Sequence, residues 1–253
     1  MNKKYNPPAL LKGLARERLA GNFGVTVRAY IWSRVIMVLI AWLTMSVSLS
    51  DTGGRVFYVV IYVISLMISG IFDAGSAFLY LHIINGRKAY PGMIFYCFRH
   101  HTDRSVLLTA YLCVLETLYS LLFAVSYILY GTSGQTGYLG LMIIGAGIMF
   151  AGYLLVHALY LPMYYLMHDF PDYSAVEIIR LCPKLTMVNI GRLVSLYISL
   201  IPLKLLEILS LGVGAPWVES YISAIESEYY MDLMNPVKAV SDPEPSYHDG
   251  VNY

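Results

Sequence analysis

The sequence predicts an all-α membrane protein: a polytopic helical bundle of about six transmembrane helices, arranged as three antiparallel hairpins with short interfacial helices on the cytoplasmic side. Composition is the first reason. Hydrophobic residues make up 58% of the 253 residues and charged residues only 13%, about half the charged share of an ordinary soluble domain. The second reason is the length of the apolar runs, because a bilayer core of roughly 30 Å needs about 20 mostly apolar residues in a helix.

Five apolar runs reach this length. They cover residues 30–49, 56–81, 106–130, 138–167 and 188–211. The last run is the least regular, since it contains Arg192, Lys204 and Glu207. A sixth stretch, residues 216–234, is amphipathic and carries four acidic residues. This stretch could cross the bilayer or lie in its interface, and both possibilities stay open.

Basic residues are distributed unevenly between the two sides of this arrangement. If the N-terminus is cytoplasmic, Arg55 is the one basic residue in the loops that face the outside. The inner side then holds the basic N-terminus together with Arg87, Lys88, Arg99, Arg104, Arg180, Lys184 and Lys238. Cytoplasmic loops of membrane proteins carry an excess of Lys and Arg. We therefore expect both termini in the cytoplasm, with a sixth span returning the tail to that side.

The chain divides into three parts on this interpretation. Residues 1–29 form a basic cytoplasmic N-terminus with an interfacial helix, and residues 30–234 form the transmembrane bundle. Residues 235–253 contain three prolines among acidic and small polar residues, which predicts a disordered cytoplasmic tail. Each hairpin follows a mildly amphipathic, basic stretch that is either an interfacial helix or an ordinary charged loop, at residues 10–23, 94–104 and 175–185.

Both ends of the chain carry a family resemblance. Near the C-terminus, Leu209-Ser-Leu-Gly-Val-Gly-Ala-Pro-Trp-Val-Glu-Ser-Tyr221 precedes Glu228-Tyr229-Tyr230-Met231-Asp232-Leu233, and the N-terminal part contains Ala15-Arg-Glu-Arg-Leu-Ala-Gly-Asn22. These segments resemble an uncharacterised family of bacterial integral membrane proteins, domain-of-unknown-function family nine-seven-five. Residues 195–202 depart from the Phe-Ile-Gly-Trp that this family often has before its fifth span. The resemblance implies a bacterial plasma membrane protein and no particular chemistry.

Ionisable side chains inside the predicted spans are candidate functional positions, because a charge within a bilayer is costly without a partner or a role. They are Asp73, Glu116, Lys204, Glu207, Glu219 and Glu226. Asp73 shares a helix face with Ser65 and Ser69 at four-residue spacing, and Glu116 lies on a similar stripe. Such faces indicate either a polar cavity or ion path, or ordinary hydrogen bonding between helices.

The last two segments are expected to pair about a turn at residues 213–214. Residues equally far from that turn then lie at equal depth, which places Lys204 within one helical turn of Glu219 and Glu226. We predict an ion pair between Lys204 and one of these acids. The same geometry predicts a second ion pair, between Arg192 and Asp232, at the inner end. These pairs would either lock the hairpin together or contribute to a site.

Motifs for catalysis or metal binding are missing from the sequence. It contains no Cys-x-x-Cys, no Gly-rich phosphate loop and no His-Glu-x-x-His, so we expect no catalytic residue, metal site or cofactor. A metal site at His100, His101 and His168 would require their two segments to meet. The net charge of +1 gives no attraction to nucleic acid.

Three classes of function are consistent with these features, in decreasing order of preference. The first is a non-enzymatic membrane protein that organises lipid or serves as a subunit of a membrane complex, with anionic lipids attracted by the basic segments. The second is a small transporter or permease, which requires a polar path joining Asp73, Glu116 and Lys204 near the midplane. The third is a membrane-embedded enzyme with a cytoplasmic-interface site, which requires contact between the regions of His100 and His168.

Overall fold

Four long helices follow the most apolar runs of the sequence. The computed structural model describes residues 5–47 and 51–234, and every regular element in that part of the chain is a helix. The long helices are α2 (Phe23–Met45), α3 (Thr52–Ile84), α4 (Thr102–Ser133) and α5 (Thr136–Tyr160). The predicted all-α fold class is therefore confirmed. The predicted tail, residues 235–253, and the end of the first predicted span at residue 49 lie outside the described residues.

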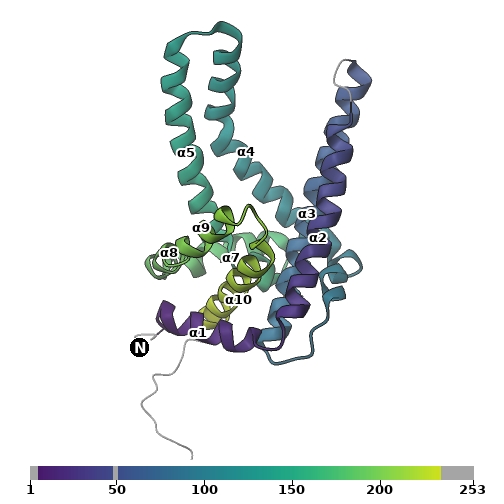
Figure 1. The fold of residues 1–253 in the computed structure, drawn as a ribbon, viewed down its shortest axis with the longest axis vertical. Helices are drawn as coiled ribbons and strands as arrows, with labels where there is room; N and C mark the ends of the chain where they lie inside the picture. The colour runs from purple at the N-terminus through teal and green to yellow at the C-terminus, as the bar shows by residue number, and fades with distance from the viewer. Residues whose placement is uncertain (1–4, 48–50, 235–253) are drawn as a thin grey trace, which may run out of the picture.

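The long helices form two hairpins, which rise from a common base and diverge from each other (Figure 1). Local chemistry explains the hairpin ends. The Asp51 side chain accepts a hydrogen bond of 3.2 Å from the Gly54 N–H and so caps the start of α3. Gly134 ends α4 with a φ of 64°, which glycine adopts without steric cost. Within the second hairpin, Gly145 and Gly152 lie directly against α4, because no side chain keeps the helices apart.

Four helical segments are long and apolar enough to cross a membrane: Phe23–Met45, Thr52–Ile84, Thr102–Thr132 and Thr136–Asp169. The last segment joins α5 to α6 (Met163–Asp169) through a bend at Leu161 and Pro162. Away from the base, their side chains are mostly apolar and exposed; Trp42, for example, is 70% exposed. Large exposed apolar surfaces of this kind mark contact with lipid or protein, so the fold is compatible with a helical membrane protein.

The segment predicted as the fifth span is not one helix. Residues 188–211 contain α8 (Ile190–Ile198) and α9 (Ile201–Leu209), each nine residues long. Pro202, at the start of α9, has no N–H to continue the hydrogen bonding of α8, and its ring clashes with a preceding helical turn. Nine residues rise only about 14 Å, against roughly 30 Å for a bilayer core. The prediction of a fifth span at residues 188–211 is therefore not confirmed.

The sixth predicted stretch forms α10 (Ala215–Met234), the central helix of the base. Twelve of its 20 residues are buried, and it packs against α1 (Pro8–Leu19), α2 and α3. Within residues 5–47 and 51–234, α10 is not among the helices that meet both the length and the hydropathy requirement for a span. Six spans and a third transmembrane hairpin are therefore not confirmed.

Short helices complete the base, at the ends of the hairpins opposite their tips (Figure 1). The three predicted interfacial stretches correspond to α1, η1 (Pro91–Phe98) and α7 (Ala175–Met187). In α1, the side chains of Leu11, Ala15 and Leu19 are fully buried, and the helix packs mainly on α10. The prediction that this apolar face lies on the membrane surface is wrong, because protein covers it.

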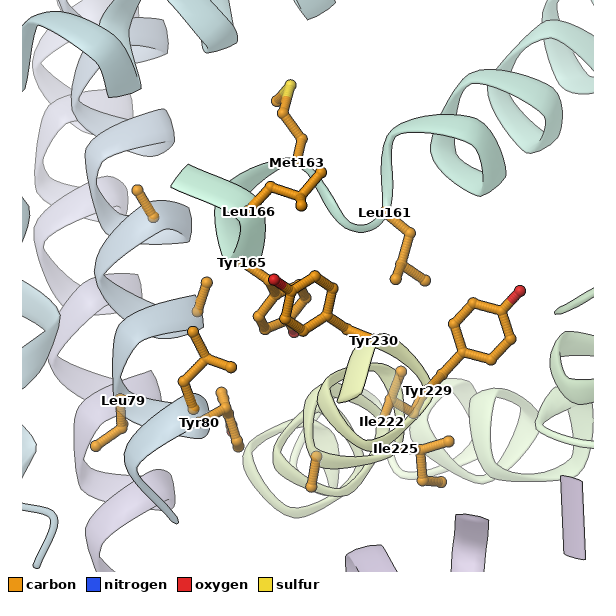
Figure 2. Packing of buried hydrophobic residues seen from close by; sticks show 14 of the residues in the cluster. Leu79, Tyr80, Leu161, Met163, Tyr165, Leu166, Ile222, Ile225, Tyr229 and Tyr230 are labelled. Atoms are coloured by element: carbon orange, nitrogen blue, oxygen red, sulfur yellow. The ribbon is translucent and has the colours of Figure 1, made fainter. Parts of the chain in front are cut away.

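The hydrophobic core lies in the base rather than between the hairpins. Figure 2 shows its centre, where the ring of Tyr230 from α10 stacks on Tyr165 from α6 with ring centroids 5.1 Å apart. The Ser227 hydroxyl donates a hydrogen bond of 3.0 Å to the Tyr165 hydroxyl. Tyr229 and Tyr230 are both fully buried, which explains the aromatic character of the C-terminal part of α10.

Candidate functional site

Ionisable side chains from six helices converge where α3 enters the base. We call this group the inter-hairpin cluster; it consists of Arg34 (α2), Asp73 (α3), Glu116 (α4), His157 (α5), Lys204 and Glu207 (α9), and Glu219 and Glu226 (α10). The six intramembrane candidates of the sequence analysis all belong to it. Arg34 and His157 are additional members that the sequence patterns do not single out.

Asp73 links the two hairpins. Its carboxylate interacts electrostatically with Arg34 of α2, His157 of α5 and Glu116 of α4. The Asp73 side chain is exposed, so Asp73 is not part of the packed core. Residues far apart in the sequence thus share one electrostatic environment around this carboxylate.

The two hairpins meet at a close crossing of α3 and α4. Gly70 of α3 lies so close to the Thr109 side chain of α4 that a Cβ atom there would overlap it. Thr109 in turn shares a hydrogen bond of 2.8 Å with the Tyr164 hydroxyl of α6. Small residues permit this close approach of two helices, and the contact sets the register between the hairpins one turn before Asp73.

Glu226 connects the cluster to the base. Its carboxylate accepts a hydrogen bond of 2.8 Å from the Tyr197 hydroxyl of α8, and His157 Nε2 lies 3.8 Å from its Oε1 atom. The Glu226 side chain is 17% exposed. Burial raises the pKa of Glu226, while His157 and the Tyr197 hydroxyl act in the opposite direction. Glu226 therefore connects α10 to α8 and α5.

Lys204 forms the contact expected with an acid of the last helix. Its ammonium group pairs with Glu219 of α10 and lies 3.3 Å from Oε2 of Glu207, one turn further along α9. The alternative partner, Glu226, pairs with His157 and Tyr197 instead. Lys204 is 47% exposed, and it lies on a helix of nine residues, which is too short to span a bilayer.

Arg192 and Asp232 form the second expected ion pair, outside the inter-hairpin cluster. Their side chains are only 14% and 2% exposed. Asn6 closes the arrangement, since its carbonyl accepts from Arg192 Nη1 at 3.1 Å and its N–H donates to Asp232 Oδ1 at 3.2 Å. The rings of Tyr5 and Tyr229 lie 4.6 and 4.7 Å from the guanidinium carbon. The pair ties the N-terminal segment to α8 and α10, which is a structural role.

Arg34 stands at the middle of α2, because this helix begins seven residues before the predicted start of the first span, at Phe23. Its guanidinium lies 5.0 Å from the ring centroid of Tyr30, one turn earlier. Both residues line an apolar groove of about 490 Å³ between α2 and the turn that joins α9 to α10; the lining is completed by Ile31, Val35, Val38, Leu39, Gly212, Ala215 and Pro216. An arginine one turn after a tyrosine, inside an apolar run, is the sequence signal that could have found this position.

The histidine segments on the base side do meet. The ring of Tyr96 stacks on His100 at 4.4 Å and lies 6.2 Å from His168. His168 Nε2 is 2.8 Å from the carbonyl oxygen of Ala74 and 3.8 Å from the Cys97 sulfur. In the described part of the chain, however, no three His, Cys, Asp or Glu side chains are arranged to hold a metal ion. The contact therefore packs α6 against α3 and η1.

No protein-family model, curated protein or solved structure matches this chain. The class of protein follows from the fold and the cluster alone: residues 5–47 and 51–234 form an all-helical fold with four helices suited to crossing a membrane and a group of ionisable side chains where two hairpins meet. The resemblance of its two ends to domain-of-unknown-function family nine-seven-five stays a prediction.

Proposed function

We propose that this protein is a non-enzymatic, multi-pass protein of the bacterial plasma membrane, with both termini in the cytoplasm, that binds the head of a phospholipid at the inter-hairpin cluster. The observation that carries the proposal is the one-sided distribution of charge. On the outer side of the cluster, residues 35–47, 56–72, 117–133 and 136–156 contain no Asp, Glu, Lys or Arg. The charged residues of the cluster thus lie at the end of the hairpins that joins the base, and the rest of each long helix on the outer side is free of charge up to the tips.

Orientation follows from the base. The helices and loops of the base carry a set of basic residues that includes Arg16, Arg18, Arg87, Lys88, Arg99, Arg104, Arg180 and Lys184, whereas the hairpin tips carry only Arg55. Basic segments stay in the cytoplasm, so the base lies inside and the cluster lies at the level of the inner leaflet. Four crossings also return the chain to the side on which it starts.

An amphiphile matches this arrangement better than a small polar solute. Its charged head would lie among the cationic and anionic groups of the cluster, with the phosphate against Arg34 because guanidinium groups favour phosphate oxygens. Its chains would run outward along the apolar groove on α2, lined by Val35, Val38 and Leu39. A lipid in this place would cover apolar surface that the fold leaves exposed.

Native mass spectrometry of the purified protein tests the proposal. Phospholipid should remain bound to the wild type and be largely lost from Arg34→Gln and Asp73→Asn. Lys88→Gln removes an exposed charge of the base and is the matched control, which should retain the lipid. Absence of retained phospholipid in the wild type, or equal retention in all three variants, would contradict the proposal.

A transporter is the second candidate, because the polar link that it requires is partly present. Asp73, Glu116 and Lys204 are connected through His157, Glu226 and Glu219. The test is an assay in proteoliposomes. If the wild type dissipates a proton or sodium gradient and Asp73→Asn does not, transport is the better proposal and lipid binding is not. The charge-free outer half of the hairpins favours the first proposal, since a path across the membrane needs polar groups on both sides of its midpoint.

A further inference from the structure

Helix α9 and the turn that follows it form an apolar surface that no other described part of the chain covers. None of the nine residues of α9 is buried. Exposure increases toward the turn: Ile208 is 69% exposed, Leu209 is 79% exposed and Leu211 is 93% exposed. In water this surface would be unfavourable, because apolar side chains are more stable when they are removed from water.

The polar side of α9 already has partners. Lys204 and Glu207 pair with each other, and Lys204 also pairs with Glu219 of α10. The packing of α9 is mainly on α10. An isolated helix shorter than about 12 residues is marginal in water, so α9 needs a further environment on its apolar side. That environment must be apolar over most of the helix circumference.

The turn beyond α9 shows which environment this is. Gly212, Ala215 and Pro216 line the same groove as residues 30–39 of α2. The first turns of α2 are part of the base, where Thr26 and Ala29 are buried. Because α2 is one of the helices suited to crossing the membrane, the turn lies beside the part of α2 that enters the inner leaflet. Its apolar surface is continuous with that of α2.

We infer that α8, α9 and the turn to α10 form a re-entrant element, which enters the inner leaflet from the side of the base, lies deepest at residues 211–213 and returns without crossing. Acyl chains of the inner leaflet cover its apolar face. The reversal is possible within so few residues because Leu211 and Gly212 both have positive φ, at 51° and 83°. The break at Pro202 lets α9 tilt relative to α8 on the way in. This element takes the place of the predicted fifth and sixth spans.

Tryptophan fluorescence in brominated lipid tests the depth of α9. The three tryptophans, Trp32, Trp42 and Trp217, are replaced by Phe, and Leu209→Trp then supplies the single reporter. Glu17→Trp in the same background is the control, since Glu17 is exposed on α1. In liposomes with bromine at the middle of the acyl chains, Leu209→Trp should lose most of its fluorescence and Glu17→Trp little. Equal quenching of the two variants, with Leu209→Trp open to acrylamide, would overturn the inference.

Cysteine accessibility separates re-entry from crossing, and it does not depend on the tryptophan variants folding. Cys97 and Cys182 are buried, so Leu211→Cys in a Cys113→Ser background gives one reactive reporter. A membrane-impermeant maleimide should label it from neither face until detergent is added. Labelling from the outer face of intact cells would show that the segment crosses, and labelling from the inner face alone would place it outside the bilayer. Either result overturns the inference, and neither bears on the binding of lipid heads at the inter-hairpin cluster.

Discussion

Glu226 is the carboxylate of the inter-hairpin cluster with partners from two other helices, α8 and α5. It is a largely buried carboxylate that touches a tyrosine hydroxyl from α8 and approaches a histidine from α5. Burial raises its pKa because the charged form loses water that the neutral form needs less. The neighbouring His157 and Tyr197 offset part of this effect. The balance makes Glu226 sensitive to pH in a way that an exposed glutamate is not.

The sign of this sensitivity gives the first residue-scale prediction. Since the pKa of Glu226 is raised in the folded protein, its stabilising contribution is complete below the ordinary value of 4.5 and is lost as pH rises through the folded-state pKa. Glu226→Gln can still accept the Tyr197 hydrogen bond but cannot ionise. We expect this variant to melt at a higher temperature than wild type at neutral pH and at a similar temperature in acid, measured by thermal unfolding in detergent.

Glu219→Gln is the matched control for this measurement. It removes a carboxylate of the same helix that is paired with Lys204 and 25% exposed, so no gain in stability is expected at neutral pH. A Glu226→Gln protein that is less stable than wild type at neutral pH would show that the ion pair with His157 outweighs the cost of burial.

At the scale of elements, two ion pairs connect α10 to the segment before it, and they differ in burial. Arg192 and Asp232 are almost enclosed, between the rings of Tyr5 and Tyr229. Lys204 and Glu219 are partly exposed. Pairing residues that are equally far from the turn at residues 213–214 predicts both contacts from the sequence. The contribution of each pair to stability depends on how deeply the surrounding residues bury it.

Substitution of the two cations by Met should separate these contributions. Arg192→Met leaves Asp232 buried without its partner, which costs about 3–5 kcal/mol, whereas Lys204→Met leaves acids that are less buried than Asp232 and costs less. The free energy of unfolding in denaturant measures both. Hydrogen exchange at residues 5–19 should increase in Arg192→Met alone, because the guanidinium also holds Asn6. Equal losses in the two variants would contradict the difference in burial.

At the scale of the whole molecule, the fold has two parts with different surfaces. The base and the two hairpins that rise from it are distinct parts of the fold (Figure 1). The base has a buried core and basic loops, and the hairpins expose mostly apolar side chains. The proposed orientation places the base in the cytoplasm. The inter-hairpin cluster then lies at the boundary between these two parts, and the re-entrant element reaches from one into the other.

Single-cysteine labelling tests the orientation of the whole molecule. Gly137, in the first turn of α5, has open space where a side chain would be, so Gly137→Cys should be tolerated. An impermeant maleimide should label Gly137→Cys on intact cells, and should label Glu17→Cys only after the cells are opened. The reverse pattern would place the base outside and would remove the argument for an inner-leaflet ligand.

Local features of the sequence are enough to predict the all-α class, the two long hairpins and the two ion pairs of α10. Helical hydrogen bonds are local, and the hydrophobicity of a run is a property of its own residues. The same features mislead at residues 188–211, where mean hydropathy indicates one span and Pro202 divides the helix. They also mislead at α1, whose apolar face looks the same whether lipid or protein covers it.

What the sequence by itself determined is therefore the kind of element at most positions and the set of ionisable residues that need partners. Only the tertiary structure decided that Asp73, Glu116 and Glu226 share one environment with Arg34 and His157. The placement of the helices that carry them depends on the close crossing of α3 and α4 at Gly70 and on the position of α10 in the base. These are contacts between residues far apart in the chain, and spacing within a single helix carries no information about them.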